Sequence, residues 1–275
     1  MQASVHQWRT HHLFEVRIDA MMTDQVLRAV DDAVETRSRL LIGMVNAAKM
    51  VMMRRDEGLR RAVLGADLIL ADGMSIVWSC RLFGLPIPER VTGIDLMEAV
   101  LKRCHERHYR VYCLGATDAV IGEIRCRIED EYAGAVLVGA RNGYYTADDE
   151  EAVAKEIAKA RPDVLFVGMS SPRKEKFLAH WSSTLGVPVC HGVGGAFDVM
   201  AGKVRRAPRL WQALGMEWAY RVWQEPKRLC RRYLFVNTVF VGMVAMEAAR
   251  GARRWAIGSP ASTSPVWRRI RTSHQ

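Results

Sequence analysis

The sequence predicts an α/β protein with a Rossmann-like, mostly parallel sheet and helices on both faces. Short apolar runs rich in β-branched residues alternate with longer amphipathic segments along most of the chain. The runs are apolar almost throughout, which is typical of strands buried on both faces, because helices cover both sides of a parallel sheet. The chain of 275 residues is long enough for one large domain or two modest ones.

Each predicted strand is an apolar run that ends at a polar residue or a turn signal. The run LLIGMVN ends in Asn46, and the run ILA is followed by Asp72-Gly73. Because Asp-Gly is favourable turn chemistry, Asp72 is either a turn residue or a functional carboxylate. The predicted strands are 40–46, 67–71, 109–115, 135–140, 163–169 and 187–193.

The segments between these runs have helical periodicity and recognisable starts. Asp95 precedes an apolar-periodic segment, Asp148 opens an acidic first turn, and Ser171-Pro172 introduces a helix because proline is tolerated in the first turn. The predicted helices are 47–64, 74–83, 95–107, 117–131, 148–160, 172–184 and 208–224.

The positive charge is concentrated in the last part of the chain. Residues 203–275 hold fifteen Lys and Arg against three acids, a net charge of +12. The whole chain has a net charge of +10, so residues 1–202 have a net charge of −2. A basic segment on a slightly acidic body predicts an anionic partner, such as nucleic acid, anionic lipid or a pyrophosphate. Nucleic acid is not indicated, because the body has no basic groove or recognised binding module.

An apolar run of about seventeen residues at 233–249 follows aromatic and basic residues. Asn237 and Glu247 lie within it, and its length is at the short limit for a membrane-spanning helix. Aromatic side chains beside arginines suit a segment that lies on the surface of an anionic membrane. Core packing and an oligomer interface are the alternatives.

The remaining composition indicates a protein without disulfides, metal or cofactor. The six cysteines form no CxxC pair, which favours reduced thiols in a cytosolic protein, and the first twenty residues lack the apolar core of a signal peptide. HERH at 105–108 reads as a solvated helix end, and the chain has no D-x-D pair.

Polar and glycine-rich residues follow the predicted strands. The carboxyl ends of parallel strands meet at one edge of the sheet, where open α/β sheets bind ligands. The candidates at this edge are Asn46, Asp72, Gly115, Tyr144, Ser171, Lys174, Gly194 and Asp198. HGVGGAFD at 191–198 matches neither G-x-G-x-x-G nor GxxxxGK[ST], so a nicotinamide- or ATP-binding loop is not indicated. Arg90 is either a surface arginine or a planar donor for phosphate.

Seven blocks, in order, resemble the WecG/TagA/CpsF family of bacterial glycosyltransferases over about residues 13–235. They are ADLILADGMSIVW, PERVTGIDLM, LGA, GYY, PDVLFVGMSSPRKEK, GVGGAFDVMAGKVRRAP and GMEWAYRVWQEPKRLCRRY. The resemblance implies a Rossmann-like fold with a basic C-terminal appendage. It also implies inverting, metal-independent transfer from a UDP-sugar to a sugar on polyprenyl diphosphate, in cell-surface polysaccharide synthesis.

The resemblance also implies roles for individual residues. Asp72 matches the family's proposed general base, and Asn46 and Arg90 match active-site residues. Tyr144 and Asp198 fall in motifs that line the nucleotide pocket. Three arginines match appendage residues thought to close over the site and grip diphosphate, namely Arg221, Arg228 and Arg231.

Two residues depart from the family pattern. Met44 stands where wall-polysaccharide members have threonine, and Lys174 stands where the motif S-P-K-Q-E has glutamine. The pocket near the sugars has therefore lost a hydroxyl and gained a cation, and we expect Lys174 to meet an acidic sugar or a phosphate. The choice between N-acetylmannosamine or its uronic acid and glucose or glucuronic acid stays open.

Three parts of the chain are expected: a Rossmann-like catalytic domain at 1–202, a basic, aromatic, membrane-associating appendage at 203–250 and a disordered basic tail at 251–275. The expected location is cytoplasmic, peripheral on the inner face of the cell membrane, with homo-oligomers possible. The alternatives are a non-catalytic membrane-docking component of a polysaccharide assembly complex and a Rossmann-type oxidoreductase.

Overall fold

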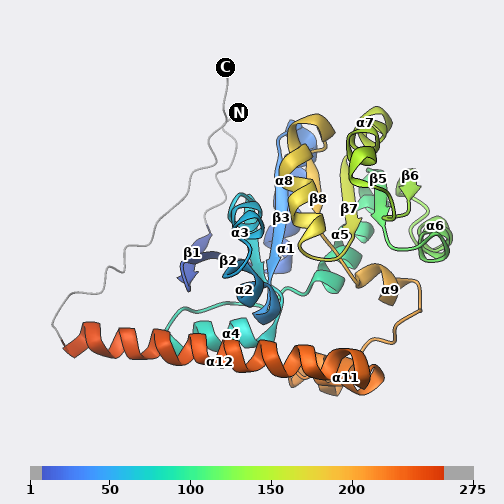
Figure 1. Ribbon diagram of the computed structural model, residues 1–275. Coiled ribbons are helices and arrows are strands. Elements are labelled where there is room, and N and C mark those ends of the chain that lie inside the picture. The colour runs from blue at the N-terminus through green and yellow to red at the C-terminus, as the bar shows by residue number, and fades with distance from the viewer. Residues whose placement is uncertain (1–7, 257–275) are drawn as a thin grey trace.

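A six-stranded, entirely parallel sheet forms the centre of the molecule (Figure 1). The computed structural model describes residues 8–256, except the side chains of Ala213, Arg228 and residues 251–256. The strand order is β4-β3-β8-β7-β5-β6. The strands are β3 (Leu40–Val45), β4 (Leu68–Ala71), β5 (Arg110–Gly115), β6 (Val136–Arg141), β7 (Val164–Gly168) and β8 (Val189–His191). The predicted fold class is confirmed.

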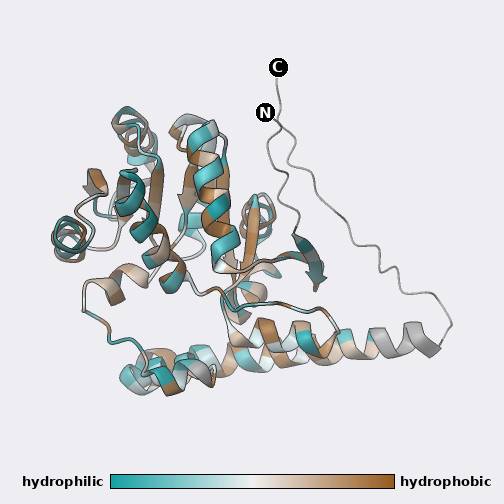
Figure 2. Ribbon diagram, turned by 180° about the vertical axis from the view of Figure 1, so that it is seen from behind, coloured by the Kyte–Doolittle hydropathy of each residue, from teal (hydrophilic) through white to brown (hydrophobic). Residues whose placement is uncertain are grey.

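Helices cover both faces of this sheet. The helices that pack on one face are α2 (Ala47–Met53), α3 (Glu57–Leu64), α7 (Glu150–Ala160) and α8 (Arg173–Leu185). The helices on the other face are α1 (Thr23–Thr36), α5 (Gly93–Arg107), α6 (Asp118–Glu131) and α9 (Ala196–Met200). Figure 2 shows hydrophobic strands at the centre and hydrophilic residues on the outer helices.

Alternate residues of each strand enter different cores. Leu165 and Val167 of β7 join the cluster that includes α7 and α8, whereas Val164 and Phe166 join the cluster that includes α1 and α5. All four side chains are fully buried. Because successive side chains of a strand point to opposite faces, two covered faces require an uninterrupted apolar run. This is the pattern from which the strands were predicted.

Two predicted helices are each interrupted. The segment 47–64 divides into α2 and α3, because the carboxylate of Asp56 accepts a hydrogen bond from the Leu59 amide at 2.9 Å and caps a new helix. The segment 208–224 divides into α10 (Arg209–Ala213) and α11 (Glu217–Gln224). Gly215 between them has φ of +67° and packs so closely on Met74 that a side chain would collide.

A hairpin of β1 (Arg9–Leu13) and β2 (Val16–Ala20) covers the β4 edge and was not predicted, nor were α1, α9 and the short 3₁₀ helix η1 (Ala147–Asp149). Asp19 accepts a hydrogen bond from the Ile69 amide at 2.8 Å. Arg17 donates to the carbonyls of Ala66 and Asp67 at 2.7 and 2.9 Å. Side chains of the hairpin thus bind backbone groups beside an edge strand that would otherwise be open to pairing.

The long helix α12 (Pro226–Ala256) packs across α2 and the hairpin (Figure 1). Val236, Phe240 and Met243 belong to the same buried cluster as β7 and α8, and the rings of Phe14 and Phe240 meet edge to face at 5.8 Å. Its stretch Leu229–Arg250 is long and apolar enough to cross a membrane by length and composition, and 22% of the apolar window is buried. Residues 257–275 of the expected tail lie outside the described residues.

Candidate active site

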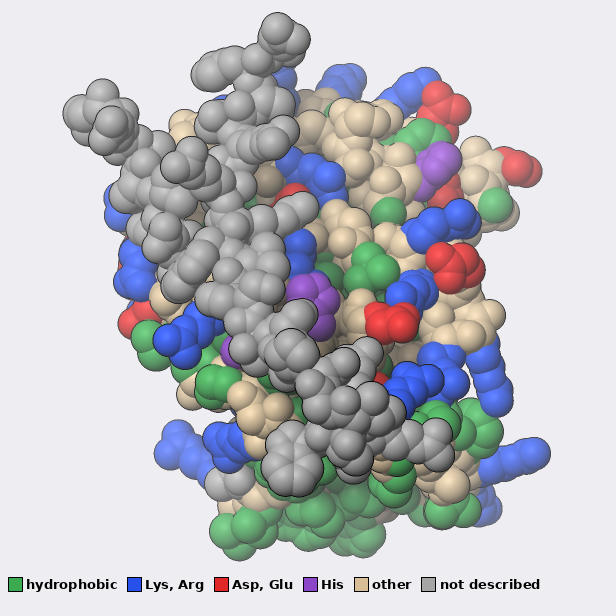
Figure 3. All heavy atoms as spheres, turned by 90° about the vertical axis from the view of Figure 1, so that its left-hand side faces the viewer, with side chains coloured by type: hydrophobic (Ala, Val, Ile, Leu, Met, Phe, Trp, Pro, Cys, Tyr) green, Lys and Arg blue, Asp and Glu red, His purple; other side chains and the backbone are tan. Residues whose placement is uncertain are grey.

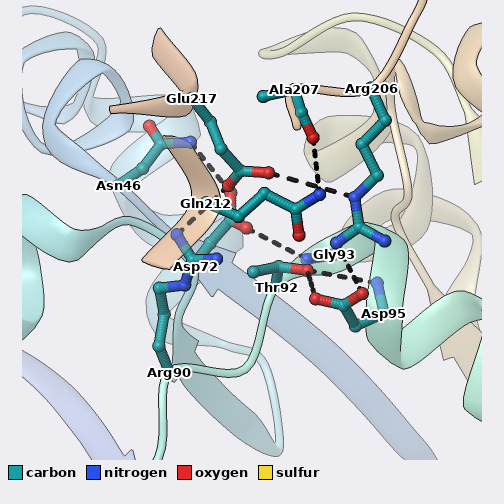
Figure 4. Close-up of polar contacts among 10 residues, drawn as sticks. All are labelled: Asn46, Asp72, Arg90, Thr92, Gly93, Asp95, Arg206, Ala207, Gln212 and Glu217. Atoms are coloured by element: carbon teal, nitrogen blue, oxygen red, sulfur yellow. Dashed lines mark hydrogen bonds and ion pairs between the residues drawn. The ribbon is translucent and has the colours of Figure 1, made fainter. Parts of the chain in front are cut away.

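Asp72 and Asn46 lie together at the carboxyl edge of the sheet, directly after the neighbouring strands β4 and β3. The amide Nδ2 of Asn46 donates to Oδ2 of Asp72 at 3.2 Å, and the backbone amide of Gly93 donates to Oδ1 at 3.0 Å (Figure 4). Both carboxylate oxygens are therefore held by donors from separate segments. Asp72 is half-buried, so its carboxylate is oriented and still accessible.

Asn46 has a second function, as the N-terminal cap of α2. Its Oδ1 accepts a hydrogen bond from the Lys49 amide at 3.0 Å. With the oxygen bound to the helix, the amide nitrogen is the atom left to face Asp72. The start of α2 thereby fixes the direction of the Asp72 carboxylate.

Two helices begin beside Asp72. Gly73 is the N-cap of α4 (Met74–Leu82), and Gly93 is the first residue of α5, whose N-cap is Thr92. The partial positive charge at helix N-termini favours a negative charge nearby. A carboxylate in this position can accept a proton from a bound hydroxyl group.

Arg90 forms an ion pair with Glu217, the first residue of α11. Its Nη1 lies 3.1 Å from Oε2, and the side chains are 17% and 24% exposed. The other oxygen of Glu217 lies 3.9 Å from Nε of Arg206. Arg206 also binds Asp95 in the first turn of α5, at 2.5 Å. Figure 4 shows these side chains gathered with Asn46 and Asp72, so the C-terminal segment reaches the strand-end site.

A buried ion cluster lies at the start of α8. Lys49 binds Glu175 at 2.7 Å and the Met44 carbonyl at 2.6 Å. Lys174 lies 3.4 Å from the same oxygen of Glu175 and donates to Oγ of Ser171 at 3.2 Å. The two ammonium groups and one carboxylate leave an excess positive charge, which burial makes costly without a further anion. The side chain of Met44 packs in the core.

The pKa values of Glu175 and Lys174 are both shifted within this cluster. Burial alone would raise the pKa of Glu175, but Lys49, Lys174 and Ser171 lower it to about 2. Burial lowers the pKa of Lys174, as does the charge of Lys49, while Glu175 and Asp72 oppose the change. Gly194 has φ of +56°, and a Cβ there would lie 3.0 Å from Nζ of Lys174. The glycine loop therefore covers the ammonium group closely.

His191, the last residue of β8, is fully buried and packs edge to face on Phe166. Burial lowers its pKa to about 4, although the backbone of Ile42 and Gly93 offsets part of the effect. The ring is therefore neutral at physiological pH. Sequence reasoning did not identify this histidine as a core residue.

The other predicted residues at this edge are not joined to Asp72 by a hydrogen bond. Gly115 ends β5, and Asp198 is half-buried on α9. Tyr144 is 75% exposed, with its backbone amide bound to Asn142. A concavity of about 530 Å³ lies at Glu150, Pro172, Arg173, Lys176, Phe177 and His180. Roles for Gly115, Tyr144, Gly194 and Asp198 therefore remain predictions.

The predicted arginines of the appendage lie on two helices. Arg221 is half-buried on α11, and Arg231 is exposed on α12. Neither forms an ion pair with the described side chains of the protein. Arg228 lies on α12, and its side chain is outside the described set.

Hydrophobic side chains gather along the lower edge of the molecule, with Lys and Arg on both flanks (Figure 3). We call the exposed apolar residues of α10 to α12 the appendage face. They are Leu210, Trp211, Leu214, Trp218, Trp223, Leu234, Phe235, Val241 and Met246, each at least 38% exposed. Exposed apolar patches of this kind mark surfaces that bind a partner or a membrane.

Among residues 8–256, no three His, Cys, Asp or Glu side chains gather as metal ligands. The histidines of HERH instead bind one backbone segment: His105 accepts from the Gly134 amide at 2.9 Å, and His108 contacts the Gly134 carbonyl at 3.0 Å. All six cysteines are free, and four are buried.

Sequence reasoning overlooked Lys49, Glu175, Arg206 and Glu217 as members of this site. Glu175 and Glu217 lie within the blocks SSPRKEK and GMEW, so inspection of each acid in those blocks would have identified them as candidate site residues. Arg206 likewise lies within the block GVGGAFDVMAGKVRRAP. Lys49 lies in none of the blocks, and its partner Glu175 is distant in the sequence.

Comparisons with known proteins match the chain to one family and to a named relative. Residues 11–254 match the sequence model of the glycosyl transferase WecG/TagA/CpsF family. A relative from Bacillus spizizenii strain W23, named N-acetylglucosaminyldiphosphoundecaprenol N-acetyl-beta-D-mannosaminyltransferase, is 34% identical over 184 residues, which are 67% of this chain and 70% of the relative.

Proposed function

The chain belongs to the WecG/TagA/CpsF family of glycosyltransferases, and on this premise we propose that it transfers a hexose-type sugar from a UDP-sugar to a sugar carried on polyprenyl diphosphate. The product would enter cell-surface polysaccharide synthesis. The name of the Bacillus spizizenii relative gives a sugar on undecaprenyl diphosphate as that enzyme's acceptor, which supports the acceptor class.

The proposal rests above all on the Asp72 carboxylate, fixed by Asn46 and the Gly93 amide. An acceptor hydroxyl attacks the anomeric carbon from the side opposite to UDP. The new carbon–oxygen bond forms as the bond to the diphosphate breaks, and Asp72 takes the hydroxyl proton. A single displacement of this kind inverts the anomeric configuration. Asp72 thus acts as the general base.

The departing diphosphate gains negative charge, and arginines are suited to stabilise it. Their planar guanidinium groups bind phosphate oxygens in pairs and stay charged. Arg221, Arg228 and Arg231 of the appendage would supply this charge, with Arg90 from the body. We propose that these cations serve in place of a metal ion.

Lys174 would meet an anionic group of the donor. Its ammonium group lies under the glycine loop, in a cluster with one more buried lysine than carboxylate. Ser171, which binds Lys174, would help to orient it. A sugar carboxylate or a diphosphate oxygen would supply the missing negative charge.

The appendage face would hold the enzyme on the inner surface of the cell membrane. Tryptophans of α10 and α11 and aliphatic side chains of α12 are exposed there, and Lys227, Arg231 and Arg232 are exposed on α12. Such a surface combines burial of apolar groups in the membrane interface with attraction to anionic lipids. Polyprenyl-linked acceptors are located in that interface.

The test is release of UDP across a panel of UDP-sugars, with a short-chain polyprenyl diphosphate sugar as acceptor and EDTA present. We expect turnover with at least one donor. A protein that binds anionic membranes but turns over no donor would instead be a non-catalytic docking component. That alternative is not favoured, because the named relative is a transferase.

A further inference from the structure

Glu217 is the acidic residue through which the basic C-terminal segment meets the Asp72 site. One oxygen of its carboxylate lies 3.1 Å from Arg90, and the other lies 3.9 Å from Arg206. The ion pair with Arg90 is less than one quarter exposed on both sides. Two guanidinium groups from separate segments thus face one carboxylate (Figure 4).

A continuous polar chain connects Glu217 to Asp72. Arg206 bridges Glu217 and Asp95, and the Asp95 carboxylate accepts from the Thr92 hydroxyl at 2.6 Å. Thr92 caps α5, whose first residue, Gly93, donates its amide to Asp72. The start of α5 therefore holds both the proposed base and Arg206, which also contacts Glu217 of α11.

The position of Glu217 also determines where Arg221 points. Both residues lie on α11, four positions apart, and side chains at this spacing share one face of a helix. A contact that turns Glu217 toward Arg90 also turns Arg221 toward the body. Arg221 is half-buried and forms no ion pair with the described side chains. Its guanidinium group is thus available for an anionic substrate.

We propose that Glu217 is a positioning residue for glycosyl transfer, which holds α11 against the Asp72 site and thereby directs Arg221 at the leaving diphosphate. This inference rests on the proposed function. Removal of the Glu217 charge takes away the carboxylate that pairs with Arg90 and leaves Arg206 with Asp95 alone, so the attachment of α11 to the site would loosen.

The experiment compares Glu217→Gln, the charge-conserving Glu217→Asp and the control Glu247→Gln. Glu247 lies on the same C-terminal segment and pairs with the exposed Arg250 at 3.5 Å. Two quantities are measured: kcat and KM for the lipid-linked acceptor with a UDP-sugar, and hydrogen exchange of the backbone amides of 215–224.

For Glu217→Gln we expect a fall in kcat of about tenfold or more, UDP affinity within about twofold of wild type, and exchange at 215–224 faster by about tenfold. Glu217→Asp recovers part of both effects because it retains the charge, and Glu247→Gln changes neither. Unchanged exchange in Glu217→Gln would show that Glu217 does not hold α11.

Faster exchange with an unchanged kcat would make the contact merely structural and overturn the positioning role. The exchange measurement also separates this inference from the proposed function. If the wild-type protein transfers no sugar, the proposed function fails together with the catalytic consequence, while exchange still decides whether Glu217 holds α11.

Discussion

The side-chain amide of Asn46 lies 3.2 Å from a carboxylate oxygen of Asp72, although the two residues are 26 positions apart. Each follows its own strand, and the strands are paired in the sheet. The contact therefore depends on parallel pairing of β3 and β4 and not on any local motif. The defined direction of the Asp72 carboxylate is a consequence of sheet topology.

Asp72→Asn should reduce turnover by about 10²–10⁴-fold, because the amide cannot accept the proton of the acceptor hydroxyl. UDP affinity should stay within about threefold of wild type, since Asp72 is proposed to contact the acceptor. Isothermal titration with UDP and a UDP-release assay measure the two quantities. Asp24→Asn, an exposed position on α1, is the matched control. A variant with normal turnover would rule out Asp72 as the base.

Lys174→Gln should lower kcat/KM for UDP-uronic acids by about 10–100-fold relative to uncharged UDP-sugars, because a charge-assisted hydrogen bond to the sugar carboxylate is lost. Competition assays with paired donors measure the ratio. If Lys174 instead binds the diphosphate, the variant should bind all donors and UDP itself more weakly, and by the same factor. Lys176→Gln, whose lysine is exposed and pairs with Asp56, is the control. No change in any of these quantities would contradict an anion-binding role.

The double variant Leu234→Glu/Val241→Glu should bind vesicles containing anionic lipid about tenfold more weakly, because it introduces two charges into the appendage face. Both side chains are more than 60% exposed, so folding should be retained. Co-sedimentation measures binding, and higher salt should weaken it further. Val136→Glu, an exposed apolar position on the far edge strand β6, is the control. Equal binding by all three proteins would exclude the appendage face as the docking surface.

His191 should make the protein less stable as the pH falls from about 6.5 to about 4. Its pKa is about 4 in the folded state and near 6.5 when the chain is unfolded, so the unfolded state binds the proton first. The loss amounts to about 3 kcal/mol across this range. Urea denaturation at several pH values should show a flatter dependence for His191→Leu than for wild type or the exposed control His180→Leu. Parallel pH curves for all three would contradict the assignment.

The strands could be predicted because each is covered on both faces, which leaves an unbroken apolar run. The hairpin could not, since RTHHL has no apolar alternation and its attachment depends on the side chains of Arg17 and Asp19. Asp72 was found because it directly follows a strand. Glu217 was not, because its partner Arg90 is 127 positions away and α11 had to be placed first.

Packing of α12 on the first hairpin has a consequence during synthesis. Met50 belongs to the same buried cluster as Phe240, and Phe14 packs against that cluster. A nascent chain therefore leaves Phe14 and Met50 partly uncovered until the last long helix has emerged from the ribosome. Removal of residues from 203 onward would leave that apolar surface exposed and prone to aggregation in the folded protein. Loss of turnover by such a truncated chain would then reflect aggregation as much as missing arginines, and single side-chain replacements are the cleaner way to separate the two.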